Sequence, residues 1–205
     1  GGEMSRRIIA FNRVSADGYF SPPDGNLNWT VPEEELDKGA AANMNGQGTL
    51  LFGRKTYEMF AAFWPHAAED PKGPEDPHSA GRRTPEVKAM ARYINDAIKI
   101  VFSRTLKEKD LKWKNSRLIN KFDPRAVEAI KQEPGKDIMI FGSGTIASQL
   151  AQSNLIDEYQ FVVGPVLLGD GRTLIDDVSQ TRRLELLEAK PYKGGNVMLR
   201  YAARK

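Results

Sequence analysis

Three apolar segments of the chain each end in a turn whose residues could bind phosphate. The residues concerned are Gly53, Arg54, Lys55, Thr56, Ser103, Arg104, Thr105, Phe141, Gly142, Ser143, Gly144, Thr145 and Ile146. Free N–H groups at a helix start attract phosphate oxygens, glycine lets the backbone come close, and arginine can bind an anion in a fork. In open α/β sheets, ligands bind outside the carboxyl ends of strands. The three turns together therefore predict a site for a phosphate-bearing ligand.

Each turn alone also has a simpler explanation. Residues 142–145 can be a turn with a helix N-cap, and residues 53–56 can be a solvated helix start. The G-x-G-x-x-G fingerprint has Ala147 at its last position, which is tolerated, but no acid stands near Val162 and Val163, where the ribose-binding acid is expected. The Walker lysine motif is absent as well. The sequence therefore predicts neither a Rossmann nor a P-loop domain.

A few further residues have both a structural and a functional interpretation. Asp17 precedes a glycine after an apolar segment, which is typical of a turn, but it could also orient or protonate a substrate. Trp29 could pack in the interior or stack on a planar ligand from its loop. His66 and His78 fall in an irregular segment, and we do not expect them to be catalytic.

Hydrophobic periodicity and turn signals give the order of the elements. We expect strands at 8–14, 49–52, 98–102, 116–119, 138–141, 159–163, 184–188 and 197–201. We expect helices from residue 32 and at 54–63, 85–93, 124–132 and 145–152. Strands alternate with helices up to residue 150, and only strands follow. This order predicts an α/β fold, with a mixed, mostly parallel central sheet, helices on both faces and an antiparallel C-terminal edge.

The domain organisation is simple. Residues 64–85 contain several prolines and little periodicity, which predicts a mobile surface loop inside a single domain spanning 4–205. Residues 1–3 are interpreted as a tag remnant.

Composition excludes several classes of function. The chain has 205 residues, of which 40% are hydrophobic and 28% charged, as in an ordinary globular protein. It contains no cysteine, so disulfides, thiolate metal sites and a cysteine nucleophile are excluded, and we expect no metal. The net charge of +3 comes without runs of like charge, which argues against nucleic acid. No apolar stretch approaches ~20 residues, so we expect no membrane span and a cytoplasmic protein.

The turns occur in an order that resembles a known family. Segments 15–20, 50–58, 99–106, 140–145 and 157–171 read SADGYF, LLFGRKTYE, KIVFSRTL, IFGSGT and DEYQFVVGPVLLGDG. In this order they are similar to the dihydrofolate-reductase-like superfamily, in particular the branch of the riboflavin-biosynthesis reductase domain. The resemblance covers residues 6–202.

The resemblance implies NADPH as cofactor, with defined roles for the turns. Residues 54–56 and 142–146 should hold the pyrophosphate, and Ser103 and Arg104 should lie near the adenosine ribose and its 2′-phosphate. NADPH should then bind better than NADH, because Arg54 and Arg104 can pair with the 2′-phosphate. Asp17 to Phe20 should form one wall of the pocket for nicotinamide and substrate, with Trp29 beside it.

The resemblance also implies an activity and an assembly. We expect an NADPH-dependent reductase that transfers a hydride to a small pterin- or pyrimidine-like substrate. The alternative is a nucleotide-binding sensor on the same fold without turnover. Three residues, Glu34, Glu35 and Asp37, are candidates for the acid that anchors the pterin, and each could also be a solvated helix residue. A homodimer is expected, because Phe161, Val163 and Leu167 would otherwise leave an apolar edge exposed.

Overall fold

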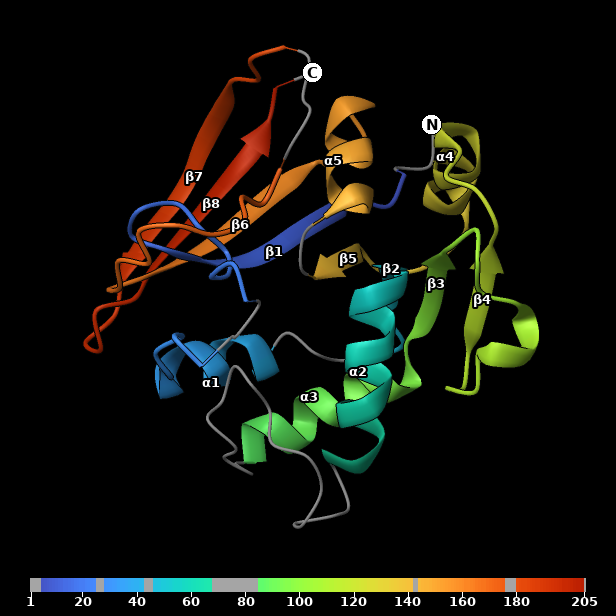
Figure 1. Ribbon diagram of the computed structural model, residues 1–205, viewed down its shortest axis with the longest axis horizontal. Coiled ribbons are helices and arrows are strands. Elements are labelled where there is room, and N and C mark those ends of the chain that lie inside the picture. Colours follow the sequence, from blue (N-terminus) through green and yellow to red (C-terminus); the bar gives the residue numbers. More distant parts are fainter. Residues whose placement is uncertain are drawn as a thin grey trace.

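The described residues form one eight-stranded sheet with helices on both faces (Figure 1). In this computed structural model the described residues are 5–24, 28–42, 46–67, 85–141, 144–175 and 180–204. The strands are β1 (Ile8–Ser15), β2 (Thr49–Gly53), β3 (Ile98–Phe102), β4 (Ser116–Ile119), β5 (Ile138–Phe141), β6 (Glu158–Gly164), β7 (Leu184–Pro191) and β8 (Val197–Ala203). Their order in the sheet is β4-β3-β2-β5-β1-β6-β8-β7.

The pairing of the strands confirms the predicted fold class. Six strands that are neighbours in the sheet, β4-β3-β2-β5-β1-β6, pair in parallel. Strand β8 pairs antiparallel with both β6 and β7. The carboxyl ends of β2, β3 and β5 therefore lie at the same edge of the sheet. This is the arrangement that the phosphate-binding interpretation of the three turns requires.

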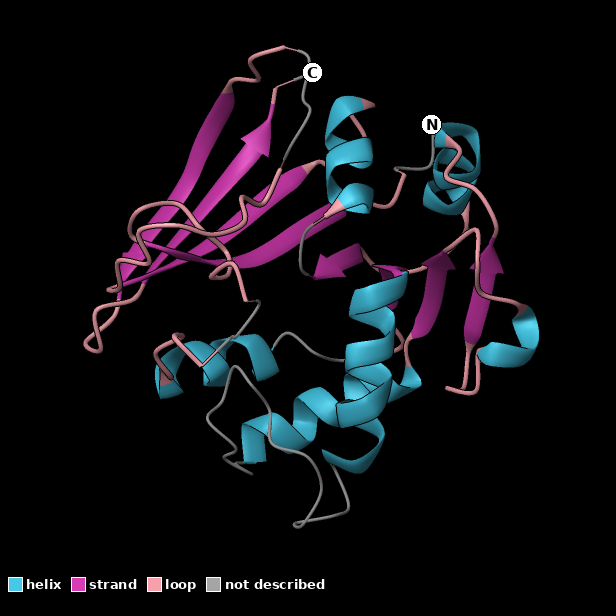
Figure 2. Cartoon of the chain, viewed as in Figure 1, coloured by secondary structure: helices cyan, strands magenta, loops and turns pink. Residues whose placement is uncertain are grey.

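Helices α4 and α5 cover one face of the sheet, and α1, α2 and α3 lie on the other (Figures 1 and 2). Their bounds are α1 (Glu34–Ala42), α2 (Arg54–Ala67), α3 (Pro85–Asp96), α4 (Pro124–Gln132) and α5 (Thr145–Gln152), with a short 3-10 helix at Glu108–Asp110. Each face has its own hydrophobic cluster. Strand β2 lies between them, and Leu50, Leu51 and Phe52 are fully buried, which explains its unbroken apolar sequence.

Local signals in the sequence fix the starts of several elements. Asp123 is the N-cap of α4, where its side chain accepts a hydrogen bond from the backbone N–H of Arg125 at 2.9 Å. Pro124 follows at the first helical position, where no N–H is needed. The strand at 98–102 and the helices at 124–132 and 145–152 occupy the predicted residues.

The structure differs from the loop predicted over residues 64–85 at the start of that segment. Helix α2 continues to Ala67 with Pro65 inside it, because Trp64 and Ala67 pack in the core against α3. The burial of these side chains outweighs the helix-breaking tendency of proline. His66 therefore lies in the last turn of α2, and α3 begins at Pro85, as predicted. Residues 68–84, including His78, lie outside the described residues.

The antiparallel end of the sheet extends beyond the helices (Figure 2). Strand β8 is only half-buried along its whole length, although it lies between β6 and β7. The outer strand β7 is exposed at nearly every position. This hairpin is longer than the predicted strands, because its residues continue to pair as far as Pro191 and Val197.

Candidate functional site

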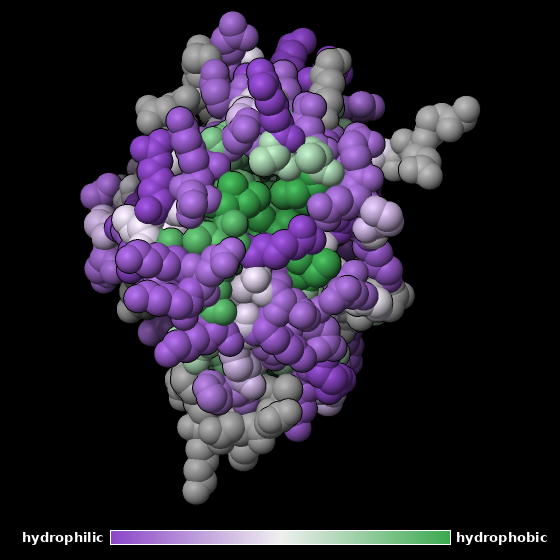
Figure 3. Space-filling model, turned by 90° about the vertical axis from the view of Figure 1, so that its right-hand side faces the viewer, coloured by the Kyte–Doolittle hydropathy of each residue, from purple (hydrophilic) through white to green (hydrophobic). Residues whose placement is uncertain are grey.

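A large cavity lies against the face of the sheet that carries α1, α2 and α3, and continues to the carboxyl ends of β2, β3 and β5. Its volume is about 1850 Å³, above the roughly 300–1,000 Å³ common for a single ligand. In the space-filling view, one face of the molecule shows a hollow with hydrophobic residues at its base and hydrophilic residues around it (Figure 3). The cavity therefore has room for more than one ligand.

The start of α2 forms part of the cavity wall. Arg54, Lys55 and Thr56 all line it. The guanidinium of Arg54 donates to the Thr105 hydroxyl at 2.6 Å, which connects the turn after β2 to the turn after β3. A Cβ added to Gly53 would lie only 3.3 Å from the side chain of Ile146. Glycine at this position thus allows the starts of α2 and α5 to approach each other closely.

The turn after β3 is held by a serine side chain. The hydroxyl of Ser103 accepts hydrogen bonds from the backbone N–H groups of Thr105 at 3.2 Å and Leu106 at 3.1 Å. This turn places Arg104 on the cavity wall together with Ser103 and Thr105. The structure thus brings the turns after β2 and β3 to one cavity.

The sequence interpretation missed a further strand end at the same wall. Asn120, Lys121 and Phe122 follow β4 and line the cavity. Phe122 packs against Phe102 with ring centroids 5.8 Å apart. The signal was available, because a cation and an aromatic residue directly follow a strand that pairs with β3. Strand β4 has only four residues, none of them fully buried, so its sequence carries little strand signal.

The start of α5 is open toward the cavity. Gly144 is the N-cap, with φ 96° and ψ −157°, a conformation that only glycine adopts readily. A Cβ at this position would meet no atom within 4 Å. Phe141, Gly144, Thr145 and Ile146 line the cavity, whereas Gly142 and Ser143 lie outside the described residues.

Asp17 ties two distant segments of chain together. Its carboxylate accepts hydrogen bonds from the Ser15 hydroxyl at 2.6 Å and from the backbone N–H groups of Leu168 at 3.1 Å and Gly169 at 2.7 Å. These bonds lower the pKa of Asp17 from 3.8 to about 2, and the bond from Ser15 has the largest effect. Asp17 does not line the cavity. This geometry favours the turn interpretation over proton donation, while the catalytic hypothesis stays untested.

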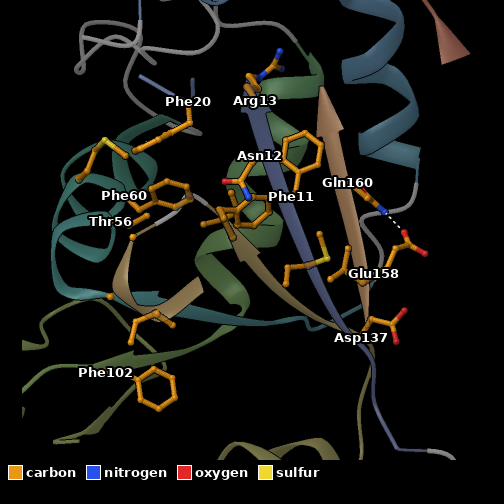
Figure 4. A pocket seen from close by; sticks show the side chains of 18 of the residues that line it. Phe11, Asn12, Arg13, Phe20, Thr56, Phe60, Phe102, Asp137, Glu158 and Gln160 are labelled. Atoms are coloured by element: carbon orange, nitrogen blue, oxygen red, sulfur yellow. Dashed lines mark hydrogen bonds between the residues drawn. The ribbon is translucent and has the colours of Figure 1, made fainter. Parts of the chain in front are cut away.

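The two predicted substrate-binding aromatic residues differ in position. Phe20 lines the cavity, and its backbone N–H donates to the carbonyl of Arg172, another cavity residue. Trp29 is absent from the lining; its ring lies beside Gly164, where an added Cβ would be 3.6 Å away. In Figure 4, Phe20 and Phe60 project toward the cavity from different elements.

The three acidic residues of α1 differ in what their side chains contact. Glu34 forms an ion pair with Lys38 at 3.0 Å, and Glu35 forms one with Lys190 at 3.6 Å. Of the three candidates, Asp37 lines the cavity. Asp37 is therefore the acid of α1 that can face a ligand.

The floor of the cavity carries an ionic cluster around one buried carboxylate, that of Glu158. Glu158, fully buried, accepts hydrogen bonds from Arg200 through Nε and Nη2, both at 3.1 Å, and from the Gln160 amide at 2.5 Å. Arg7 adds a contact at 3.4 Å. Burial alone would raise the pKa of Glu158, but the bonds from Arg200 and Gln160 outweigh it, and the pKa is lowered. The carboxylate thus stays charged and fixes its neighbours.

The described residues contain neither a membrane-spanning helix nor a cluster of metal ligands. None of the helices there is long and apolar enough to cross a membrane. The same residues contain no group of three or more histidine, aspartate or glutamate side chains arranged to hold a metal ion.

The chain resembles known proteins over nearly its whole length. It is 29% identical over 196 residues to the uncharacterized protein YyaP of Bacillus subtilis (strain 168), covering 96% of this chain and 94% of YyaP. A crystal structure of a putative riboflavin biosynthesis protein from Shewanella sp. PV-4 has a TM-score of 0.70 at 20% identity, covering 97% and 99% of the two chains.

Dihydrofolate reductase is also a structural neighbour. The enzyme from Enterococcus faecalis, solved in complex with NADP(H) and RAB-propyl, has a TM-score of 0.58 at 13% identity, covering 97% of each chain. This likeness confirms the dihydrofolate-reductase-like fold. The family model described as the RibD C-terminal domain matches residues 6–198. The chain therefore belongs to the RibD C-terminal domain family.

Proposed function

We propose that the protein is an NADPH-dependent reductase of a small heterocycle. The observation that carries this proposal is the joining of four strand ends on one cavity wall. These ends contribute four cations, Arg54, Lys55, Arg104 and Lys121, and none of the described lining residues from these segments is acidic. Two helix N-termini, of α2 and α5, open on the same wall. This is the chemistry that a dinucleotide with three phosphate groups requires.

The cations suit NADPH in particular. Arg104 lies with Lys121 at the ends of the neighbouring strands β3 and β4, beside the aromatic surface of Phe122. In our proposal this corner holds the adenosine and its 2′-phosphate, and the starts of α2 and α5 hold the pyrophosphate. The NADP(H) bound by the dihydrofolate reductase of similar fold supports this assignment.

Bound NADPH would supply a hydride from its nicotinamide ring to an electrophilic carbon of the substrate. The chain's part is to place that carbon and exclude water. Phe11, Phe60 and Phe141 form an aromatic group in the cavity, with ring centroids of Phe141 at 6.0 Å from Phe11 and 5.9 Å from Phe60. Asp37 lines the same cavity from α1 and can bind an amino or protonated nitrogen group. These features support a planar, nitrogen-containing substrate of the pterin or pyrimidine class.

Fluorescence titration with NADPH and NADH tests the cofactor assignment. The Arg104→Ala variant should lose about 10- to 100-fold in NADPH affinity, because each charge-assisted hydrogen bond contributes roughly 1.5–3 kcal/mol. Its NADH affinity should change little. Arg125→Ala, an exposed arginine outside the cavity, is the control. Equal affinity of the unmodified protein for both cofactors would contradict the proposal.

Turnover is a separate measurement. Oxidation of NADPH is followed by absorbance with a panel of pteridines and pyrimidines. Oxidation that depends on one of these substrates supports a reductase. Tight NADPH binding without turnover on the whole panel would instead favour the sensor function.

A further inference from the structure

A single row of side chains crosses the floor of the cavity. Strand register places Phe141 beside Phe11, Phe11 beside Gln160, and Gln160 opposite Arg200. Neighbours at one register position point to the same face of a sheet, and all four line the cavity. Figure 4 shows Phe11 and Gln160 on adjacent strands, with Gln160 joined to Glu158. The row is therefore aromatic at its β5 and β1 end and polar at its β6 and β8 end.

The polar end of the row is fixed by the buried carboxylate of Glu158. Oxygen Oε2 of Glu158 accepts from both the Gln160 amide and Nε of Arg200, so the two side chains are fixed side by side. Because the amide nitrogen of Gln160 donates to Glu158, the carbonyl oxygen of that amide is left as an acceptor. The side chain of Gln160 makes no other hydrogen bond within the described part of the chain.

Arg200 keeps donors available beside this acceptor. A guanidinium has five N–H groups, and the bonds to Glu158 use two of them. The positive charge is offset by Glu158 and by Glu188, whose carboxylate lies 4.0 Å away. A charge balanced in this way suits a neutral carbonyl oxygen better than a phosphate.

We propose that Gln160 and Arg200 recognise a cis-amide edge of the substrate, an N–H group beside a C=O group in one ring. The Gln160 carbonyl accepts from the ring N–H, and Arg200 donates to the ring C=O. The aromatic end of the row holds the rest of the ring. Glu158 is a positioning residue that orients both side chains. This inference rests on the proposed reductase function and narrows its substrate class to lactam-bearing heterocycles.

The test uses the NADPH-loaded protein and two probes, lumazine and 1,3-dimethyllumazine, whose methyl groups replace both ring N–H groups. Isothermal titration calorimetry should show at least about tenfold tighter binding of lumazine, the effect of about one hydrogen bond. In Gln160→Met, which keeps the side-chain length, this preference should fall to within about twofold. Glu158→Gln should reduce the preference as well, because the neutral amide no longer fixes both partners.

The preference ratio is a readout that a purely structural role would not move. Gln132→Met, on the exposed end of α4, should keep it unchanged. NADPH titration of every variant checks the fold and tests the proposed function independently. The inference is overturned if NADPH binds but the unmodified protein binds neither probe, shows no preference, or keeps its preference in Gln160→Met. Failure to bind NADPH would instead overturn the proposed function.

Discussion

Asp17 shows how one carboxylate can hold two loops without lining the site. Its folded-state pKa of about 2 is below the ordinary 3.8, so its stabilising effect is present above about pH 4 and lost as the pH falls toward 2. Asp17→Asn loses one of the two backbone bonds to residues 168 and 169. Urea denaturation should therefore show a less stable variant near neutral pH and no difference from the unmodified protein near pH 2.

Asp170→Asn is the matched control, because within the described residues the Asp170 side chain bonds only the next backbone N–H. An Asp17→Asn profile that coincides with the unmodified protein at every pH would contradict this account. Turnover of an identified substrate tests the catalytic interpretation of Asp17. If Asp17 were the catalytic acid, Asp17→Asn would lower the rate per folded molecule by ~10²–10⁴; we expect only a small change.

Lys99 gives the stability of the protein a second pH dependence, in the alkaline range. Its side chain is fully buried, lies 4.3 Å from the ring of Trp113 and donates to the carbonyl groups of Asn95 and Lys114. Burial first, and then nearby Lys114, lower its pKa from 10.5 to about 8. Between about pH 8 and 10.5 the unfolded chain binds more protons at Lys99 than the folded protein does. The free energy of unfolding should therefore rise with pH over this range, by up to about 3 kcal/mol.

Lys99→Met removes the titrating group and should flatten this rise. It should also be less stable at neutral pH, because two buried carbonyl groups lose their donor. Denaturation curves measured from about pH 7 to about pH 10 give both quantities. A rise of equal size in the variant would show that another group is responsible.

At the scale of elements, the start of α5 depends on backbone conformation. An alanine at Gly144 meets no neighbouring atom, but the positive φ is strained for any residue with a Cβ. Gly144→Ala should therefore lower the stability by about 1–3 kcal/mol and weaken NADPH binding. Gly39→Ala is the contrast, because Gly39 lies within α1 with open space around it. It should stabilise the protein by about 0.5–1 kcal/mol. Thermal unfolding of both variants would show opposite shifts; a shift of the same sign contradicts the argument.

The sequence predicted elements best where local signals and burial agree. Strand β3 is buried and apolar apart from Lys99, and α4 has both an N-cap and a first-turn proline, so both are found at the predicted residues. The end of α2 was missed because tertiary packing of Trp64 overrides the local effect of Pro65. The cavity wall was predicted at three strand ends from turn chemistry. The floor, with Gln160 and Arg200, was not, because its residues meet only through the sheet register.

For the whole molecule, the uncovered end of the sheet suggests an assembly. Leu186 and Leu187 on β7 are 55% and 47% exposed, and Leu167 is 77% exposed. Phe161 and Val163 are partly covered on β6. Since no described helix covers β7 and β8, we propose that a second copy of the chain packs against this apolar face.

Sedimentation at micromolar concentration tests the homodimer. Leu186→Glu should shift the protein toward monomer by placing a charge in the contact. Glu185→Ala, which points to the other face of the same strand, should not. A monomer for the unmodified protein would exclude this assembly.

The position of β1 has a consequence for how the chain folds. This strand precedes the seven other strands along the chain and lies in the middle of the sheet between β5 and β6. Ile8 is aligned with Ile138, and Ile9 with Glu158. Both of its neighbours are therefore synthesised more than a hundred residues later. Until β5 and β6 have been synthesised, this largely apolar strand lacks its partners and can bind chaperones or pair wrongly. Contacts of such long sequence separation also place folding among the slower cases, on the order of milliseconds to seconds.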